Sequence, residues 1–226
     1  MDYGYYPGCS LTGSAHKLDK GLKRVFARQG HTLREIPDWN CCGAFEYGDR
    51  KELAAFSKKN LEKAQGHFSQ IVAPCPACYK NLKEADEGRD FEITHPLDLF
   101  DEAFFSSMKQ GRDLKGKVFT PYYGCILLRP RETAIRNTTV MEEAITRFGG
   151  DVAGERVKDR CCGGNQVFIN KSVTEKLSRL VLERSQGTVV VFCPLCHMAM
   201  KTFSGDRKVV YFTDLLLYIM GENSAL

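Results

Sequence analysis

The chain alternates short apolar runs with longer segments in which apolar side chains recur every three to four positions. Leu18, Leu22, Val25 and Phe26 fall on one face of such a segment, which extends from about Ser14 to Gln29 and ends at a glycine. The pattern predicts strands at 2–6, 31–36 and 69–73, and further helices at 50–64 and from Pro76 onward. The first half is therefore expected to alternate strands and helices.

The second half repeats this alternation. Residues 188–192 consist only of Thr, Val and Phe, which is typical of a strand buried on both faces of a parallel sheet. Further strands are predicted at 117–121 and 209–211. A helix is predicted at 132–148, and another begins at a capping box from Ser172 to Glu175. Two more helices are predicted, one from Pro194 onward and one at 213–220.

Alternating strands and helices predict an α/β fold with parallel strands. A polar, glycine-containing linker at 106–117 separates a first domain at 1–107 from a second at 115–226. We expect two pseudo-symmetric, Rossmann-like halves. Cysteines follow several predicted strands, so they should lie in loops at the carboxyl edges of the sheets, where open α/β sheets bind ligands.

Composition narrows the class of protein. The 226 residues are 43% hydrophobic and 27% charged, as in ordinary globular proteins, and the net charge of +4 is too small to indicate a nucleic-acid partner. No apolar run approaches the roughly 20 residues needed to span a membrane, and no signal peptide is visible. We therefore expect a cytoplasmic protein, in which cysteines stay reduced and bind metal or carry out redox chemistry rather than forming disulfides.

The cysteines form two sets of five in the same order. Each set has one single cysteine, then a Cys-Cys-Gly, then a Cys-x-x-Cys, and the second set follows the first by 116 to 120 residues. The first set is Cys9, Cys41, Cys42, Cys75 and Cys78, and the second is Cys125, Cys161, Cys162, Cys193 and Cys196. This arrangement indicates an internal duplication.

Five thiols in each set exceed what a simple site uses. A structural zinc ion and a cubane [4Fe–4S] cluster each take four ligands. Adjacent cysteines also diverge, so they rarely both reach one small ion, whereas a larger inorganic core can accept both. The sequence favours a polynuclear iron–sulfur core with bridging thiolate in each half, and zinc in one motif remains the alternative. A Cys-x-x-Cys at a helix start suits this chemistry because the helix N-terminus stabilises thiolates.

The repeated motif resembles the duplicated cysteine-rich CCG domain found in the B-type subunit family of heterodisulfide reductases. Nearly the whole chain is covered, and all ten motif cysteines are present. The resemblance implies two noncubane [4Fe–4S] clusters, each held by the five cysteines of one motif. It also implies reductive cleavage, or formation, of a disulfide between the clusters, with no separate catalytic side chain. The implied partners are a C-type, ferredoxin-like protein with [4Fe–4S] clusters and an A-type protein that contains flavin.

Three functions stay open at this point. The first is an oxidoreductase subunit that reduces or forms a disulfide, either of a small thiol cofactor or of a lipoyl carrier. The second is an electron-relay subunit of a lactate, glycolate or succinate dehydrogenase complex. The third is a zinc-stabilised interaction module.

Other residues near the motifs have simpler interpretations. Gly43 and Gly163 are either turn glycines or positions whose N–H groups donate to a cluster. His197 completes a formal haem-attachment pattern, which we reject because the equivalent first-half residue is Tyr79. Four tyrosines beside the single cysteines are expected to be packing residues or walls of a cleft: Tyr5, Tyr6, Tyr122 and Tyr123. No glycine-rich phosphate loop is present, so no nucleotide or flavin site is expected.

Overall fold

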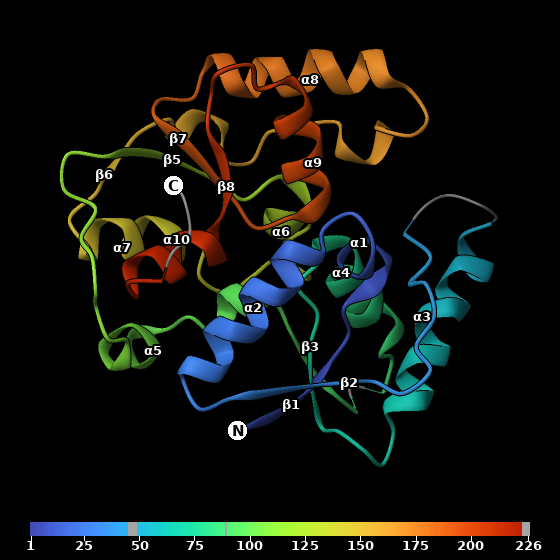
Figure 1. Cartoon of the computed structure of the whole chain (residues 1–226). Coiled ribbons are helices and arrows are strands. Elements are labelled where there is room, and N and C mark those ends of the chain that lie inside the picture. Colours follow the sequence, from blue (N-terminus) through green and yellow to red (C-terminus); the bar gives the residue numbers. More distant parts are fainter. Residues whose placement is uncertain (45–48, 89, 223–226) are drawn as a thin grey trace.

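Two four-stranded parallel sheets, one from each half, form the frame of the molecule (Figure 1). The computed structural model describes residues 1–44, 49–88 and 90–222. The first sheet has the order β2-β1-β3-β4 and the second β6-β5-β7-β8, so equivalent strands occupy equivalent places. All pairs are parallel. The strands are β1 (Asp2–Tyr5), β2 (Thr32–Glu35), β3 (Gln70–Val72), β4 (Glu92–Thr94), β5 (Val118–Tyr122), β6 (Asp151–Val152), β7 (Thr188–Val191) and β8 (Val209–Tyr211).

Helices connect the strands and cover the sheets, which confirms the predicted α/β architecture with two similar halves. In the first half they are α1 (Gly8–Thr12), α2 (His16–Arg28), α3 (Arg50–Ala64), α4 (Pro76–Ala85), the 3₁₀ turn η1 (Pro96–Asp98) and α5 (Glu102–Ser107). In the second half they are α6 (Cys125–Leu128), α7 (Val140–Arg147), η2 (Glu155–Val157), η3 (Gly164–Gln166), α8 (Lys171–Glu183), α9 (Pro194–Phe203) and α10 (Phe212–Ile219).

Local structure differs from the sequence prediction in several places, and the short strands β4 and β6 were not predicted. The helix predicted from residue 132 begins only at Val140, because the Asn137 side chain accepts hydrogen bonds from Thr139 and holds the preceding segment in turns. The N-cap of α8 is Asn170, whose side chain accepts from the Val173 N–H, rather than the predicted Ser172. Cys9 and Cys125 lie in short helices, not in loops.

The two halves meet through equivalent elements at their carboxyl edges. Helix α1 packs on α9, and α4 packs on α6, so each half contributes a single-cysteine helix and a Cys-x-x-Cys helix to the contact. Helix α2 also packs on α10. Figure 1 shows α1, α4 and α6 gathered between the two sheets. The cysteine segments of the two halves therefore face one another.

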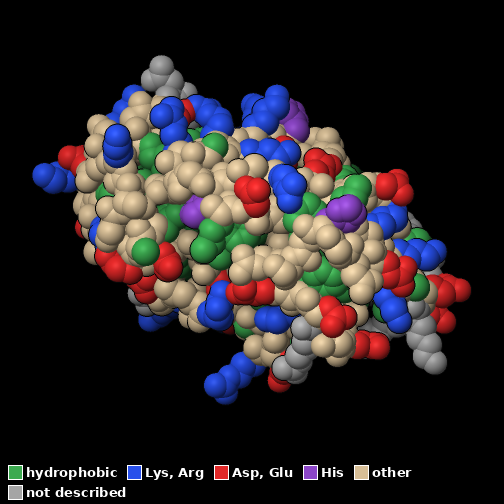
Figure 2. Space-filling view, turned by 90° about the horizontal axis from the view of Figure 1, so that it is seen from below, with side chains coloured by type: hydrophobic (Ala, Val, Ile, Leu, Met, Phe, Trp, Pro, Cys, Tyr) green, Lys and Arg blue, Asp and Glu red, His purple; other side chains and the backbone are tan. Residues whose placement is uncertain are grey.

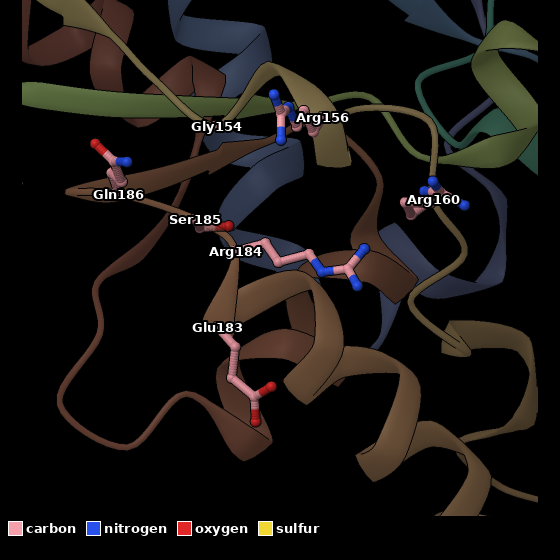
Figure 3. Close-up of a pocket in the computed structure, with 7 residues that line it drawn as sticks. All are labelled: Gly154, Arg156, Arg160, Glu183, Arg184, Ser185 and Gln186. Atoms are coloured by element: carbon pink, nitrogen blue, oxygen red, sulfur yellow. The ribbon is translucent and has the colours of Figure 1, made fainter.

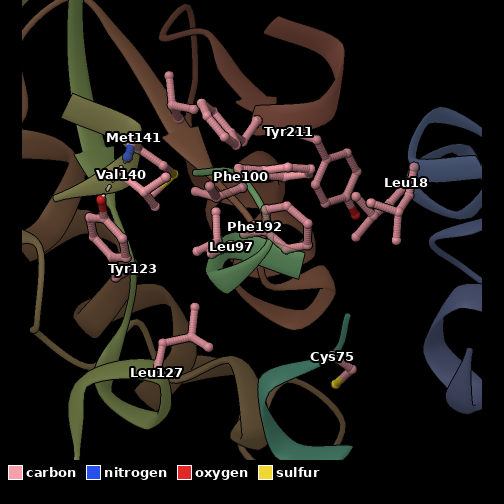
Figure 4. Close-up of a cluster of buried hydrophobic side chains, with 14 of the residues drawn as sticks. Leu18, Cys75, Leu97, Phe100, Tyr123, Leu127, Val140, Met141, Phe192 and Tyr211 are labelled. Carbon is pink, nitrogen blue, oxygen red and sulfur yellow. Dashed lines mark hydrogen bonds between the residues drawn. The ribbon is translucent and has the colours of Figure 1, made fainter. Parts of the chain in front are cut away.

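One hydrophobic core runs through both halves (Figure 4). Phe100, from the first half, lies 6.3 Å from the ring of Phe192 and 5.9 Å from that of Phe212, both from the second half. The linker also contributes, because Met108 and Leu114 are buried. The linker is therefore packed and not simply polar. The domain boundaries predicted at residues 107 and 115 stay a prediction.

The surface is ordinary for a globular domain. Figure 2 shows basic and acidic side chains interspersed over one face, with small apolar patches between them. No helix among the described residues is long and apolar enough to cross a bilayer. The predicted cytoplasmic location stays a prediction.

The shared core predicts that the halves unfold together. Phe100→Ala removes a ring that is 1% exposed and touches both halves, so it should lower the free energy of unfolding by about 3–5 kcal/mol. Urea denaturation of the reduced protein, followed by circular dichroism and tryptophan fluorescence, should show one shifted transition. Phe56→Ala, at a ring that is 42% exposed, should cost less than about 1 kcal/mol. Two separate transitions for the wild type would contradict a common core.

Candidate metal-binding site

The five cysteines of the first half come together although they are distant in sequence. The Cys42 and Cys78 sulfurs are 3.2 Å apart. Cys9 interacts with Cys41, and Cys75 with Cys78. Gly8, beside Cys9, is so close to Cys78 that an added Cβ would lie 2.8 Å from its sulfur. The single-cysteine helix therefore rests against the Cys-x-x-Cys.

The second half repeats this cluster. Cys125 interacts with Cys161, and Cys196 interacts with both Cys162 and Cys193. A Cβ on Gly124 would lie 3.3 Å from the Cys196 sulfur. The structure thus brings together each predicted set of five, and binding of metal by these ten thiols stays a prediction.

Gly43 and Gly163 are turn glycines whose N–H groups donate to a cysteine sulfur, and donation to a cluster stays a prediction. Each has a left-handed φ, 73° and 74°, and a Cβ would meet backbone atoms, Leu53 O at 2.6 Å and Thr174 Cα at 2.9 Å. Their N–H groups also donate to the Cys41 and Cys161 sulfurs at 3.5 and 3.4 Å. A glycine at this position therefore lets the chain turn and stabilises the preceding thiolate.

Each Cys-Cys pair is held at both ends by hydroxyl groups. Tyr6 and Tyr122 donate to the carbonyl just before the pair, that of Asn40 and of Arg160, each at 2.5 Å. A buried serine, Ser57 in α3 or Ser178 in α8, donates to the carbonyl of the second cysteine at 2.9 Å. Tyr6 and Tyr122 are fully buried, so they are positioning residues, whereas Tyr123 lines the cavity between the halves.

The first half adds two side-chain amides, of the buried Asn60 and the half-buried Asn81, that the second half lacks. Asn60 donates to the Asn40 and Phe56 carbonyls, and Asn81 donates to the Cys42 carbonyl at 3.0 Å. The equivalent positions in α8 and α9 are Val181 and Ala199, which cannot form these bonds. The two cysteine clusters therefore share a framework but differ in how their loops are fixed.

The thiols of each cluster differ in pKa, some being raised and others lowered. A hydrogen bond from Cys125 lowers the pKa of Cys161 to about 6, with further help from the Gly163 N–H and Arg129. Hydrogen bonds from Cys42 and Cys9 likewise lower the pKa of Cys41. The complementary bonds, together with burial, raise the pKa of Cys9 and Cys125. The first cysteine of each Cys-Cys pair is therefore a readier thiolate than the single cysteine of its set.

A cavity of about 240 Å³ lies between the halves. All five cysteines of the second set line it, and the first half closes it with Ala44, Pro76 and Ala77. Apolar side chains such as Ile126 and Leu195 complete the walls. The second cluster is therefore next to a small, largely apolar chamber that only the two halves together can form.

A histidine and a tyrosine pack together beside each cluster, and the position that holds the histidine in one half holds the tyrosine in the other. His95 packs on Tyr79 in the first half, with ring centroids 5.8 Å apart, and Tyr211 stacks on His197 in the second, at 3.8 Å. His95 also lies across the interface, 4.8 Å from Phe192, the residue before Cys193. The alternation of strands and helices did not indicate His95 as a site residue. Its place beside the first cluster depends on where strand β4 ends.

His95 is neutral and fixes the peptide before Cys75. Burial lowers its pKa to about 3. Its Nδ1 accepts from the Leu97 N–H, so Nε2 carries the proton and donates to the Pro74 carbonyl at 3.1 Å. His197 is partly buried and stacked on Tyr211, which agrees with a supporting place beside the cluster.

The donor set can be compared with what metals require. In the described part of the chain, no three cysteine, histidine or carboxylate side chains are placed to hold a single metal ion. A polynuclear cluster has a different requirement, because its ligands bind separate iron atoms and surround the core. Sulfurs that are neighbours in pairs, with N–H groups directed at them, fit this second arrangement.

Comparison with known families assigns the chain to a domain family. The cysteine-rich domain called CCG matches residues 3–83 and 119–201, one match for each half. The chain belongs to the CCG cysteine-rich domain family. Both matches include the complete cysteine motif of their half, and the family therefore confirms the duplication.

Two curated proteins show the range of relatives of this CCG protein. The B-type subunit of a CoB-CoM heterodisulfide reductase from Methanosarcina acetivorans, described as ferredoxin/F420H2-dependent, is 21% identical over 85% of this chain and 77% of the relative. This match confirms the predicted resemblance. The 8-methylmenaquinol:fumarate reductase membrane anchor subunit of Wolinella succinogenes is 24% identical over 92% of this chain and 85% of the relative.

A solved structure shares the fold of the CCG protein. The crystal structure of a hypothetical protein from Helicobacter pylori superimposes with a TM-score of 0.74 at 11% identity. It covers 98% of this chain, and this chain spans about half (49%) of that structure. At this identity the likeness concerns the fold alone.

The difference in pKa between the thiols predicts which of two exposed cysteines reacts first. Cys161 and Cys9 are both exposed, but only Cys161 has a lowered pKa. At pH 7 in the reduced, metal-free protein, iodoacetamide should alkylate Cys161 at least about tenfold faster than Cys9, as measured by peptide mass spectrometry. Lowering the pH to 5, below the pKa of about 6, should slow Cys161 by protonating it.

The unfolded protein in urea is the control, because there all ten thiols should react at similar rates. Equal rates for Cys9 and Cys161 in the folded protein would contradict the hydrogen-bond pattern described above.

Proposed function

We propose that this chain is the iron–sulfur subunit of a heterodisulfide reductase-like complex, which reduces a disulfide at the contact between its two halves. The observation that carries the proposal is the pair of five-thiol clusters, built alike and facing one another across one interface. A duplicated site suits a substrate with two equivalent sulfur atoms. A CCG domain in each half and the relationship to a heterodisulfide reductase protein support this assignment.

The ten cysteines would hold two [4Fe–4S] clusters, one per set, and the fifth thiol of each set suggests the noncubane form. When bound, such clusters supply electrons one at a time. The protein contributes the placement of the thiols through Tyr6, Tyr122, Ser57 and Ser178, and the N–H groups of the following glycines.

The chamber lined by the second set would hold the cluster of that set, and the disulfide would bind on the side of the cluster that the first half closes with Ala44, Pro76 and Ala77. The chamber walls come from both halves and are mostly apolar, which favours a neutral disulfide over water. Reduction consumes two electrons and two protons and releases two thiols. The cluster would fill much of the 240 Å³ chamber, so only the reacting sulfur atoms would enter it, and the remainder of a larger thiol cofactor or a lipoyl carrier would stay outside.

Two electrons per turnover require a donor. We propose a ferredoxin-type partner with [4Fe–4S] clusters, like the C-type component of heterodisulfide reductases. A flavin-containing partner, like the A-type component, would feed it. The chain itself offers no glycine-rich phosphate loop for a flavin.

A second candidate function is an electron relay in a fumarate or succinate oxidoreductase complex. The observation that favours it is the 24% identity, over 92% of this chain, to the fumarate reductase subunit of Wolinella succinogenes. In a relay the clusters pass electrons onward, and no disulfide has to enter the chamber.

Separate removal of one thiol from each half distinguishes the two functions. Cys42→Ser and Cys162→Ser alter equivalent buried positions. If both clusters act on one disulfide, each variant should lose reductase turnover by at least about 100-fold, measured anaerobically with reduced methyl viologen and a panel of disulfides. Ser10→Ala, which changes a neighbour of Cys9 but no thiol, should keep its turnover.

A relay predicts a different outcome. The wild type would then show no disulfide turnover at all, although it accepts electrons from viologen. Loss of turnover in one cysteine variant only would contradict joint action of the two halves. Circular dichroism and gel filtration of each variant would identify any that misfolds.

A further inference from the structure

A larger cavity lies in the second half, apart from the cysteines (Figure 3). Its volume is about 1070 Å³, and it forms between the segment after β6 and the end of α8. The lining residues are Gly154, Arg156, Arg160, Glu183, Arg184, Ser185 and Gln186. It shares none of these with the chamber beside the second cluster.

Three arginines give the cavity its character. Figure 3 shows Arg184 extending from the end of α8 toward Arg160, with Arg156 on the neighbouring segment. Elsewhere in α8, Arg179 is paired with Glu175 at 2.8 Å. Within the described part of the chain, by contrast, the structure shows no ion pair or hydrogen-bond acceptor for the three guanidinium groups. Among the lining residues that the structure describes, three arginines stand against one acidic residue, Glu183.

The three arginines are exposed side chains that line one hollow, and a cleft lined by one sign of charge attracts ligands of the opposite charge. A guanidinium group presents a planar fork of N–H donors that matches the oxygens of a carboxylate or a phosphate. Several such forks around one space can contact more than one anionic group. The chemistry therefore favours a multiply charged oxyanion over a single small ion.

The cavity walls are fixed by bonds that leave the three arginines available. Thr120 donates to the Gln186 carbonyl at 2.7 Å and accepts from its N–H at 2.8 Å. A fourth arginine, Arg207, which is not among the lining residues, donates to the Ser185 carbonyl at 2.6 Å. Gly154 packs so closely on Thr120 that a Cβ would lie 2.5 Å from its methyl carbon. The backbone that presents the arginines is thus held in place.

We propose that this cavity binds a small molecule carrying two or more oxyanion groups, either phosphoryl or carboxylate. Its volume matches the upper range of small-molecule sites. Arg160 is also the residue before Cys161, and its carbonyl is held by Tyr122. A ligand on Arg160 therefore contacts the same peptide segment that positions the second cysteine cluster.

Isothermal calorimetry on the full-length protein tests the site with defined probes. Pyrophosphate represents phosphoryl ligands and citrate represents carboxylate ligands, with acetate at equal ionic strength as the comparison. We expect pyrophosphate or citrate to bind at least tenfold more tightly than acetate. Arg156→Gln and Arg184→Gln should each weaken that binding by about tenfold, since each removes a charged hydrogen-bonding group.

Arg179→Gln is the matched control, because it removes an arginine from the same helix that points to Glu175 and not into the cavity. It should leave binding within about twofold of the wild type. Tighter binding of pyrophosphate supports a phosphorylated ligand, and tighter binding of citrate supports a polycarboxylate.

Two results would overturn the proposal. One is equal, weak binding of all three anions. The other is unchanged affinity in the double variant of Arg156 and Arg184. No cysteine is among the described lining residues and the assay measures anion binding alone, so a failure of this proposal is distinguishable from a failure of the proposed disulfide reduction.

Discussion

The shared carboxyl edge of each parallel sheet is the constraint on which the rest of the molecule depends. Strands β1 and β3 are hydrogen-bonded neighbours, so the segments that follow them leave the sheet at the same place. This alone brings Cys9 next to Cys75 and Cys78, about 70 positions later in the chain. The same pairing of β5 with β7 assembles the second cluster. Without parallel strands, no short loop could unite these thiols.

Because the domain is duplicated, two such sheet edges meet and enclose a chamber between them. Each cluster by itself would lie open at the end of a sheet, and the contact of α1 with α9 and of α4 with α6 covers both. His95 and Tyr211 show that the halves have diverged within this symmetry, since they occupy equivalent positions with different side chains. His95 bonds to Pro74 in its own half and joins the halves through its contact with Phe192.

Sequence patterns predicted the parts of the fold that depend on local signals. Helices with a clear apolar face, the strand at 188–192 and the helices beginning at Pro76 and Pro194 all appear where expected. The short strands β4 and β6 have too few residues for an alternating pattern, and the turns at 132–139 depend on the Asn137 side chain. The bonds from Tyr6, Tyr122, Ser57 and Ser178 to carbonyl groups join segments that are distant in sequence. The arginine cavity likewise unites residues 154–160 with 183–186, which no motif connects.

An iron–sulfur cluster in each set of five thiols is the proposal on which the function rests. Iron and acid-labile sulfide should be measured on anaerobically purified protein together with its visible absorption spectrum. We expect about eight iron and eight sulfide per chain, as two [4Fe–4S] clusters require, and a thiolate-to-iron charge-transfer band. Zinc at one or two ions per chain, with no iron and no such band, would contradict this expectation and favour a zinc-stabilised interaction module.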